Sequence, residues 1–283
     1  MNKLSFNDLK DKVCVITGGG GVIGKTLSEG LASVGVRMAI TDISKELADN
    51  VSRCIAKEYN VESISVEADV LDRGSLLKVK DKINREMGKI DILINCAGGN
   101  SPKATTEIEF IDKDTIDDLG KTFFGLDIDG FRKVFDLNFL GTILSTMVFA
   151  QDMIERRSGV ILNVSSMNAF RPLTKIPAYS AAKASVNNFT EWLAVHLAKI
   201  NIRVNAIAPG FFLTNQNKFL LIDEKTGNLT PRGNMILNST PMGKFGAPED
   251  LQGTVLYLLS DLSRFVTGVV IPIDGGFNAY AGV

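Results

Sequence analysis

The sequence predicts an α/β fold with a doubly wound, mostly parallel seven-stranded sheet and helices on both of its faces. Short apolar runs rich in β-branched residues alternate with longer stretches in which apolar residues recur every three to four positions. The runs are nearly continuous, as in parallel strands buried on both faces, and right-handed crossovers then give the doubly wound sheet. Neither an internal repeat nor a Pro/Ser-rich linker interrupts the 283 residues, so we expect one domain.

Each element follows from this alternation. The strands are expected at residues 12–17, 37–42, 63–69, 91–97, 159–166, 202–209 and 268–275. The helices are expected roughly at residues 24–34, 45–59, 73–87, 131–157, 178–199 and 248–260. Two long segments break the rhythm: the insert, about residues 99–130, and the lid, about residues 211–247. Both would leave from the carboxyl edge of the sheet, where ligands bind. For the insert, a solvated acidic excursion is an equally good interpretation.

Composition excludes several classes of function. A net charge of -1 and a pI near 6.0 give no basic field for nucleic acid or an anionic membrane. No apolar run approaches the roughly 20 residues that span a bilayer, and the polar N-terminus lacks the apolar stretch of a signal peptide. Cys14, Cys54 and Cys96 have no metal-ligand spacing, so we expect no metal and free thiols in a reducing cytoplasm. His196 is the only histidine, which excludes a site with a histidine pair, and it lies in a helix-like stretch where we expect it to pack or to lie at the surface rather than to act in catalysis.

A glycine-rich turn, residues 17–24, joins the first strand to the first helix. Such a turn points backbone N–H groups and the positive end of a helix at a phosphate. Asp42 ends the second strand about 20 residues later, where a carboxylate can accept hydrogen bonds from both ribose hydroxyls. The alternative is that Asp42 caps the next helix, a role for which Ser44 is equally suited. Asp69 and the segment 95–99 close the next two strands, so polar or small residues would border one crevice.

Val22 interrupts the glycines of this turn. A β-branched residue resists positive φ, so the unusual dihedral angles must fall within residues 18–21. We therefore expect a turn shifted by one residue that still binds phosphate.

Tyr179 and Lys183 are four residues apart, one above the other on a helix. A phenol has a pKa of about 10, and a neighbouring ammonium would lower it by stabilising the phenolate. The spacing is common by chance and, taken alone, fits ordinary helix packing. Ser166 changes this balance, because it ends an apolar strand and its hydroxyl could polarise a carbonyl group that the tyrosine protonates.

These motifs resemble the short-chain dehydrogenase/reductase family over residues 12–277, nearly the whole chain. The matching segments are the glycine-rich turn, Asp69-Val70, NCAG (95–98), Asn138 in FDLNFLG, Ser166, YSAAK (179–183), RVNAIAPG (203–210) with Thr214, and PMGKFGAPEDL (241–251). The resemblance implies a Rossmann fold and a homotetramer. It also implies Tyr179 as general acid/base, Lys183 as its electrostatic partner and ribose ligand, Ser166 as substrate polariser, and Asn138 as the holder of a proton-relay water. The family usually has glycine where this chain has Val22.

The resemblance further implies NAD as the cofactor. The residues expected to bind it are Gly18, Gly21, Ile23, Gly24, Asp42, Asp69, Val70, Asn95, Ala97, Gly98, Tyr179, Lys183, Pro209, Gly210 and Thr214. We expect NAD(H) rather than NADP(H), because Asp42 would repel a 2′-phosphate and neither Ile43 nor Ser44 offsets its charge.

The insert and residues 165–183, 209–217 and 275–283 resemble a narrower branch of the family, the D-mannonate oxidoreductases (fructuronate reductases). A sugar acid is then the expected substrate, with D-fructuronate and D-mannonate the leading pair. Among the cations on nearby loops (Arg171, Lys175, Lys218 and Arg232), Arg171 is expected to bind the carboxylate. The expected substrate residues are Asn100, Ser166, Asn168, Arg171, Tyr179 and Asn215. The alternatives are a reductase of another sugar or of a 3-oxoacyl thioester, and a non-catalytic NAD-sensing protein.

Overall fold

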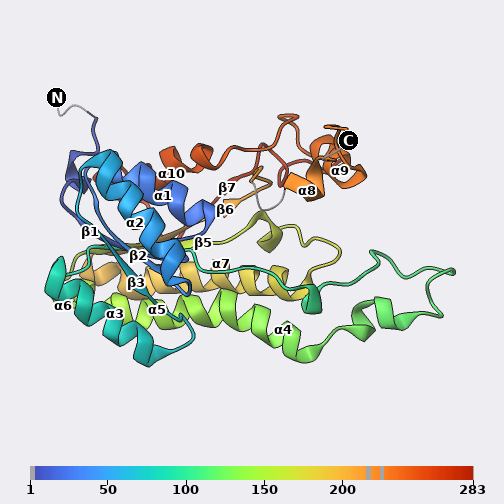
Figure 1. Ribbon diagram of the computed structural model, residues 1–283, viewed down its shortest axis with the longest axis horizontal. Helices are drawn as coiled ribbons and strands as arrows, with labels where there is room; N and C mark the ends of the chain where they lie inside the picture. Colours follow the sequence, from blue (N-terminus) through green and yellow to red (C-terminus); the bar gives the residue numbers. More distant parts are fainter. Residues whose placement is uncertain (1–3, 215–217, 224–225, 283) are drawn as a thin grey trace.

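The computed structural model describes residues 4–214, 218–223 and 226–282, and the predicted sheet is present in it (Figure 1). Seven strands form one sheet in the order β3-β2-β1-β4-β5-β6-β7, and every neighbouring pair is parallel. The strands are β1 (Val13–Thr17), β2 (Arg37–Asp42), β3 (Ser63–Glu67), β4 (Ile92–Asn95), β5 (Gly159–Val164), β6 (Ile202–Pro209) and β7 (Val270–Ile273). The predicted fold class is confirmed.

The helices lie in two layers, one on each face of the sheet (Figure 1). One layer contains α1 (Val22–Ala32), α2 (Lys45–Tyr59) and α10 (Gln252–Leu259). The other contains α3 (Arg73–Glu86), α4 (Ile128–Phe135), α5 (Gly141–Phe149), α6 (Gln151–Arg156) and α7 (Pro177–Leu197). Among the described residues, no helix has both the length and the apolar character needed to cross a membrane.

Two hydrophobic cores explain why the strands are continuously apolar. Cys14 and Ile16 of β1 pack toward α1, α2 and α10, whereas Val13 and Val15 pack toward α3, α5 and α7. Since successive side chains of a strand point to opposite faces, a sheet covered on both faces needs apolar residues at every position.

Two expected elements differ from the structure. The single helix expected at 131–157 is divided into α4, a π-helical turn (Asp136–Leu140), α5 and α6. The lid, expected to be irregular, contains α8 (Lys218–Leu221) and α9 (Pro231–Asn238). Thr230 caps α9 by accepting a hydrogen bond from the backbone N–H of Gly233, and Pro231 occupies the first turn, where its missing N–H costs nothing.

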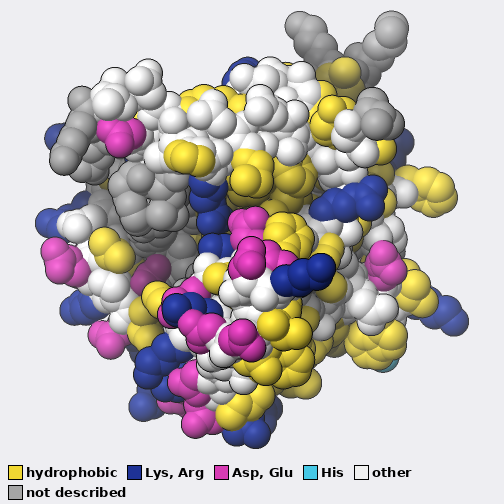
Figure 2. Space-filling model, turned by 90° about the vertical axis from the view of Figure 1, so that its right-hand side faces the viewer, with side chains coloured by type: hydrophobic (Ala, Val, Ile, Leu, Met, Phe, Trp, Pro, Cys, Tyr) yellow, Lys and Arg dark blue, Asp and Glu magenta, His cyan; other side chains and the backbone are white. Residues whose placement is uncertain are grey.

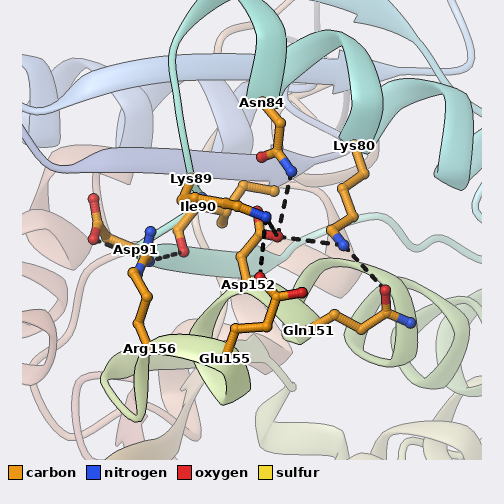
Figure 3. A network of polar contacts seen from close by, with 9 residues as sticks. All are labelled: Lys80, Asn84, Lys89, Ile90, Asp91, Gln151, Asp152, Glu155 and Arg156. Atoms are coloured by element: carbon orange, nitrogen blue, oxygen red, sulfur yellow. Dashed lines mark hydrogen bonds and ion pairs between the residues drawn. The ribbon is translucent and has the colours of Figure 1, made fainter.

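A buried carboxylate network accounts for the position of α6 (Figure 3). Asp152 has no solvent exposure and accepts hydrogen bonds from Lys89 Nζ (3.1 Å), Asn84 Nδ2 (3.3 Å) and the backbone N–H of Ile90 (3.2 Å). Lys80 Nζ lies 3.3 Å from the same carboxylate. Burial raises the pKa of Asp152, but these hydrogen bonds and the lysine charges outweigh it and hold the pKa below its ordinary value. The network ties α3, α6 and the start of β4 together.

The insert extends away from the body of the molecule between β4 and α4 (Figure 1). Phe110, Phe123 and Phe124 are exposed on it, and the view onto this end of the molecule shows hydrophobic side chains beside charged ones (Figure 2). Its base is attached to the loop before α7. There, Lys175 Nζ donates to the carbonyl oxygen of Glu107 (2.7 Å) and the N–H of Thr106 donates to that of Lys175 (3.0 Å).

Candidate active site

The glycine-rich turn keeps its unusual geometry away from Val22. Gly18 has a φ of +64°, Gly21 precedes α1, and Val22 is the first residue of that helix. The expectation that the strained dihedral angle falls within residues 18–21 is therefore confirmed. A Cβ atom on Gly24 would lie 2.3 Å from the carbonyl oxygen of Gly18, so the helix can approach the turn only because this residue is glycine.

The turn can hold the pyrophosphate of a dinucleotide. No side chain among the described residues caps the N-terminus of α1, so its first N–H groups can bind an anion. The turn is also fixed from both sides: a Cβ on Gly18 would lie 2.7 Å from the Cα of Ala97, and one on Gly20 2.6 Å from the Cβ of Leu47. A rigid, backbone-lined helix N-terminus fits a phosphate group.

Asp42 borders the turn as a hydrogen-bond acceptor. Its Oδ2 accepts from the N–H of Gly20 and its Oδ1 from the N–H of Ser44, each at 3.0 Å. Ser44 is the residue that caps α2, by accepting from the N–H of Leu47 (3.4 Å). Of the two roles weighed for Asp42, the cap is therefore held by Ser44, and Asp42 lines the cleft described next.

A cleft of about 500 Å³ joins the turn to the groups expected to react. Residues from five strand ends line it, and they include most of the predicted set: Gly18, Gly21, Ile23, Gly24, Asp42, Ala97, Gly98, Ser166, Tyr179, Lys183, Pro209, Gly210 and Thr214. The lining residues outside the predicted site set are Val22, Cys96, Gly99, Val164, Ser165, Phe211 and Phe212. Phe211 and Phe212 could have been predicted, because they directly follow Pro209 and Gly210, which were expected to bind the cofactor.

Three predicted cofactor residues do not line this cleft. Asn95 is buried, and its Nδ2 donates to Thr146 Oγ1 and Asn163 Oδ1, each at 2.9 Å. Its side chain therefore belongs to the packed face of the sheet, and a cofactor contact of this residue stays a prediction. Asp69 is exposed just after β3 and accepts from the N–H of Leu71, and Val70 is buried. A cofactor contact for these two residues stays a prediction.

Ser166, Tyr179 and Lys183 lie close together in the lining of the cleft. Lys183 Nζ lies 5.7 Å from the centre of the Tyr179 ring and donates to the carbonyl oxygen of Val164 (2.8 Å). Burial raises the pKa of the Tyr179 phenol, which a hydrogen bond with Ser166 partly offsets. Burial also lowers the pKa of Lys183 to about 8, against the influence of Cys96. The phenol pKa therefore lies above its ordinary value, and the lowering expected from Lys183 is not seen in the described structure.

Asn138 lies in the π-helical turn and is completely buried. Its Nδ2 donates to the carbonyl oxygens of Gly99 (2.7 Å) and Val134 (2.8 Å), and its Oδ1 accepts from the N–H of Gly99 (3.1 Å). A Cβ on Gly98 would lie 2.5 Å from Asn138 Oδ1 and 3.3 Å from Lys183 Nζ. The side chain thus anchors the loop after β4 beside the reacting groups, and the relay water stays a prediction.

The predicted substrate residues are less closely grouped. Asn168 is buried beside Ser166, whose Oγ accepts from the N–H of Asn168 (3.2 Å). Asn100 is exposed and donates to Thr105 Oγ1 (2.9 Å). Arg171 is exposed, and its Nε donates to the carbonyl oxygen of Asn278 (3.4 Å) in the C-terminal segment. Asn215 lies outside the described residues.

Comparison with known proteins agrees with this geometry. A family model described as enoyl-(acyl carrier protein) reductase matches residues 20–278. An uncharacterized oxidoreductase of Haemophilus influenzae is 49% identical over 287 residues, covering 100% of this chain and 99% of the relative. The uncharacterized oxidoreductase UxuB of Bacillus subtilis is 47% identical over 277 residues, covering 98% of each chain. The chain belongs to this family, the short-chain dehydrogenases/reductases.

A solved structure narrows the comparison. It is a crystal structure from Haemophilus influenzae, provisionally named a D-mannonate oxidoreductase, with bound NAD. It superimposes on this chain with a TM-score of 0.92 at 48% sequence identity, and the match covers 98% of each chain.

Proposed function

We propose that this protein is an NAD-dependent oxidoreductase that acts on a sugar acid, with D-fructuronate and D-mannonate as the leading substrate pair. The observation that carries the proposal is the convergence of Ser166, Tyr179 and Lys183 in the cleft that also contains the glycine-rich turn. When bound there, NADH supplies the hydride that reduces a ketone, and the carbonyl oxygen must gain a proton as the alcohol forms.

The protein's own groups supply and orient that proton. The Ser166 hydroxyl can donate a hydrogen bond to the carbonyl oxygen and so polarise it. The Tyr179 phenol can donate the proton, and its raised pKa keeps it in the protonated, donating form at neutral pH. The Lys183 ammonium stabilises the phenolate that remains.

Asp42 supports NAD(H) rather than NADP(H). Its carboxylate lines the cleft and accepts hydrogen bonds from the N–H groups of Gly20 and Ser44. A 2′-phosphate would meet this fixed negative charge, whereas two ribose hydroxyls would find an acceptor.

The sugar-acid assignment depends on Arg171. Its Nε donates to the carbonyl oxygen of Asn278, which orients the guanidinium; within the described residues its two terminal nitrogens have no hydrogen bond and could meet a carboxylate bidentately. Lys175, the other cation of this loop, donates to the carbonyl oxygen of Glu107 and attaches the loop to the insert. The provisional name of the Haemophilus structure also supports a sugar acid. The homotetramer remains a prediction from the family resemblance, and the cytoplasmic location remains a prediction from the cysteine usage.

The test is a screen of sugar acids followed by NADH absorbance, with two variants compared on the best substrate. Arg171→Ala should raise KM for the acid far more than for a neutral ketose of the same length. Lys175→Met is the matched control, because displacing the loop should raise both KM values equally.

Two outcomes would contradict the proposal. Equal effects of Arg171→Ala on the acid and the neutral ketose would remove the carboxylate assignment. Tight NADH binding without turnover of any sugar acid would favour the NAD-sensing alternative.

A further inference from the structure

Two buried polar pairs connect β5 and its end to α7. Ser165 Oγ donates to Asn187 Oδ1 and also lies 3.3 Å from the carbonyl oxygen of Lys183. Asn163 Nδ2 donates to Thr190 Oγ1 (2.9 Å). All of these side chains are at most 9% exposed. The two pairs are alike in chemistry and in the elements they join, but they differ in their distance from the cleft.

Only the first of these two pairs adjoins the reacting groups. Ser165 stands between Val164, whose carbonyl oxygen accepts from Lys183 Nζ, and Ser166. Asn187 follows Lys183 by four residues, one turn further along α7. The N–H of Ser165 also donates to the carbonyl oxygen of Ile207 on β6 (2.8 Å), so this residue is fixed to the sheet as well as to the helix.

We propose that Ser165 and Asn187 are positioning residues, which set the distance between Ser166 at the end of β5 and the Tyr179–Lys183 face of α7. The inference rests on the proposed oxidoreductase function. Ser166 and Tyr179 come from different elements, and a carbonyl oxygen must reach both hydroxyls at once. A buried hydroxyl–amide bond holds such a separation tightly, because breaking it leaves unpaired polar groups in the core.

The surroundings of Lys183 make this positioning measurable. Cys96, in the loop after β4, is the titratable group from outside α7 that acts on both Lys183 and Tyr179 among the described residues. Asp42 in turn acts on Cys96. A shift of the helix relative to β5 moves the Lys183 ammonium relative to the bound substrate and the phenol, and so changes how strongly the lysine stabilises the phenolate.

The experiment compares Asn187→Leu with Thr190→Val, each close in shape to the residue it replaces. Each removes one buried bond between β5 and α7, so both should lower Tm by about 2–5 °C. Asn187→Leu should also lower kcat by about 10–100-fold, because a small misplacement of reacting groups is costly. It should shift the apparent pKa of the kcat/KM profile by about half a unit or more. Thr190→Val should leave both kcat and the pH profile of kcat/KM as they are in the parent protein.

Affinity for NADH, measured by calorimetry, provides a readout that needs no substrate. Asn187→Leu should weaken binding by about threefold or more, since Lys183 is the expected ribose ligand, and Thr190→Val should not. Ser165→Ala should reproduce the effects of Asn187→Leu on kcat and on NADH affinity. The double variant should lose no more kcat or affinity than the more impaired of the two single variants. If the parent enzyme reduces a carbonyl compound other than a sugar acid, the same variants can be compared on that compound. Failure of the sugar-acid assignment can therefore be distinguished from failure of the positioning proposal.

The proposal is overturned if Asn187→Leu and Thr190→Val lose stability alike and leave kcat, the pH profile and the NADH affinity equally unchanged. Additive effects of Ser165→Ala and Asn187→Leu would also overturn it, because the two residues would then not act as one unit.

Discussion

Replacing Asp152 by asparagine should destabilise the protein far more than removing a surface charge from the same network. Asp152 has no exposure, and the change would leave Lys80 and Lys89 facing a neutral amide. Breaking a buried ion pair costs about 3–5 kcal/mol. Because Lys89 is 46% exposed and can regain water, we expect the lower end, about 3 kcal/mol.

This free energy converts into a measurable change of melting temperature. Unfolding entropy of about 2.1 cal/mol/K per residue gives about 0.6 kcal/mol/K for 283 residues, so Tm should fall by about 5 °C at pH 7. The pKa of Asp152 lies below its usual value of 3.8 in the folded state. Its stabilising contribution is therefore complete above about pH 3.8 and is lost as the pH falls through the lower folded-state value. The difference between the two proteins should narrow in that acidic range.

Glu155→Gln is the matched control, to be followed by circular dichroism melts in the same buffers. Glu155 contacts the same Lys89 Nζ at 3.1 Å but is 60% exposed, so its loss should cost at most about 1 kcal/mol and lower Tm by less than about 2 °C. The reasoning is refuted if Asp152→Asn melts as close to the parent as Glu155→Gln does. A difference that persists unchanged down to pH 3 would refute the ionisation argument alone.

Three further predictions concern the cleft. Tyr179→Phe should lower kcat by about 10²–10⁴-fold in steady-state assays while NADH affinity is largely kept, and near-normal kcat would show that another group carries the proton. Asp42→Ala should raise KM for NADH and lower the ratio of kcat/KM for NADH to kcat/KM for NADPH. A parent enzyme with equal or better kcat/KM for NADPH would contradict the role of Asp42 in selecting NADH. Val22→Gly should change NADH affinity only modestly in calorimetry, because Val22 already lies in α1; a tenfold gain, about 1.4 kcal/mol, would mean that Val22 obstructs the phosphate.

The strands could be predicted because a strand buried on both faces needs apolar residues at nearly every position, and such runs are recognisable in the sequence. The break before α6 could not be predicted in the same way. Residues 146–155 contain no proline or glycine. From the sequence alone Asp152 would be expected on the solvent-facing side of a helix, because the groups that bury and bind it come from α3 and the start of β4. The helix α9 was predictable in principle, since Thr230 and Pro231 together form a standard helix start.

The candidate site shows a similar division. Groups that a motif places on one helix, such as Tyr179 and Lys183, lie where their spacing predicts. The direction of Asn95 also followed from strand alternation, because it shares a face of β4 with Leu93, which packs toward the α5 layer. The partners of Arg171 and Lys175 could not be foreseen, since they come from the C-terminal segment and from the insert.

The strand order also determines how the chain is exposed during synthesis. β1 pairs with β2 on one side, but its other neighbour is β4, and the 53 residues from Asp42 to Asn95 separate the completion of these two pairings. At the usual elongation rate of about 5–20 residues per second, one edge of β1 stays unpaired for about 3–10 s. An open strand edge presents unpaired N–H and C=O groups and is a template for association with other chains. The nascent protein therefore needs chaperone protection at this edge until its fourth strand emerges.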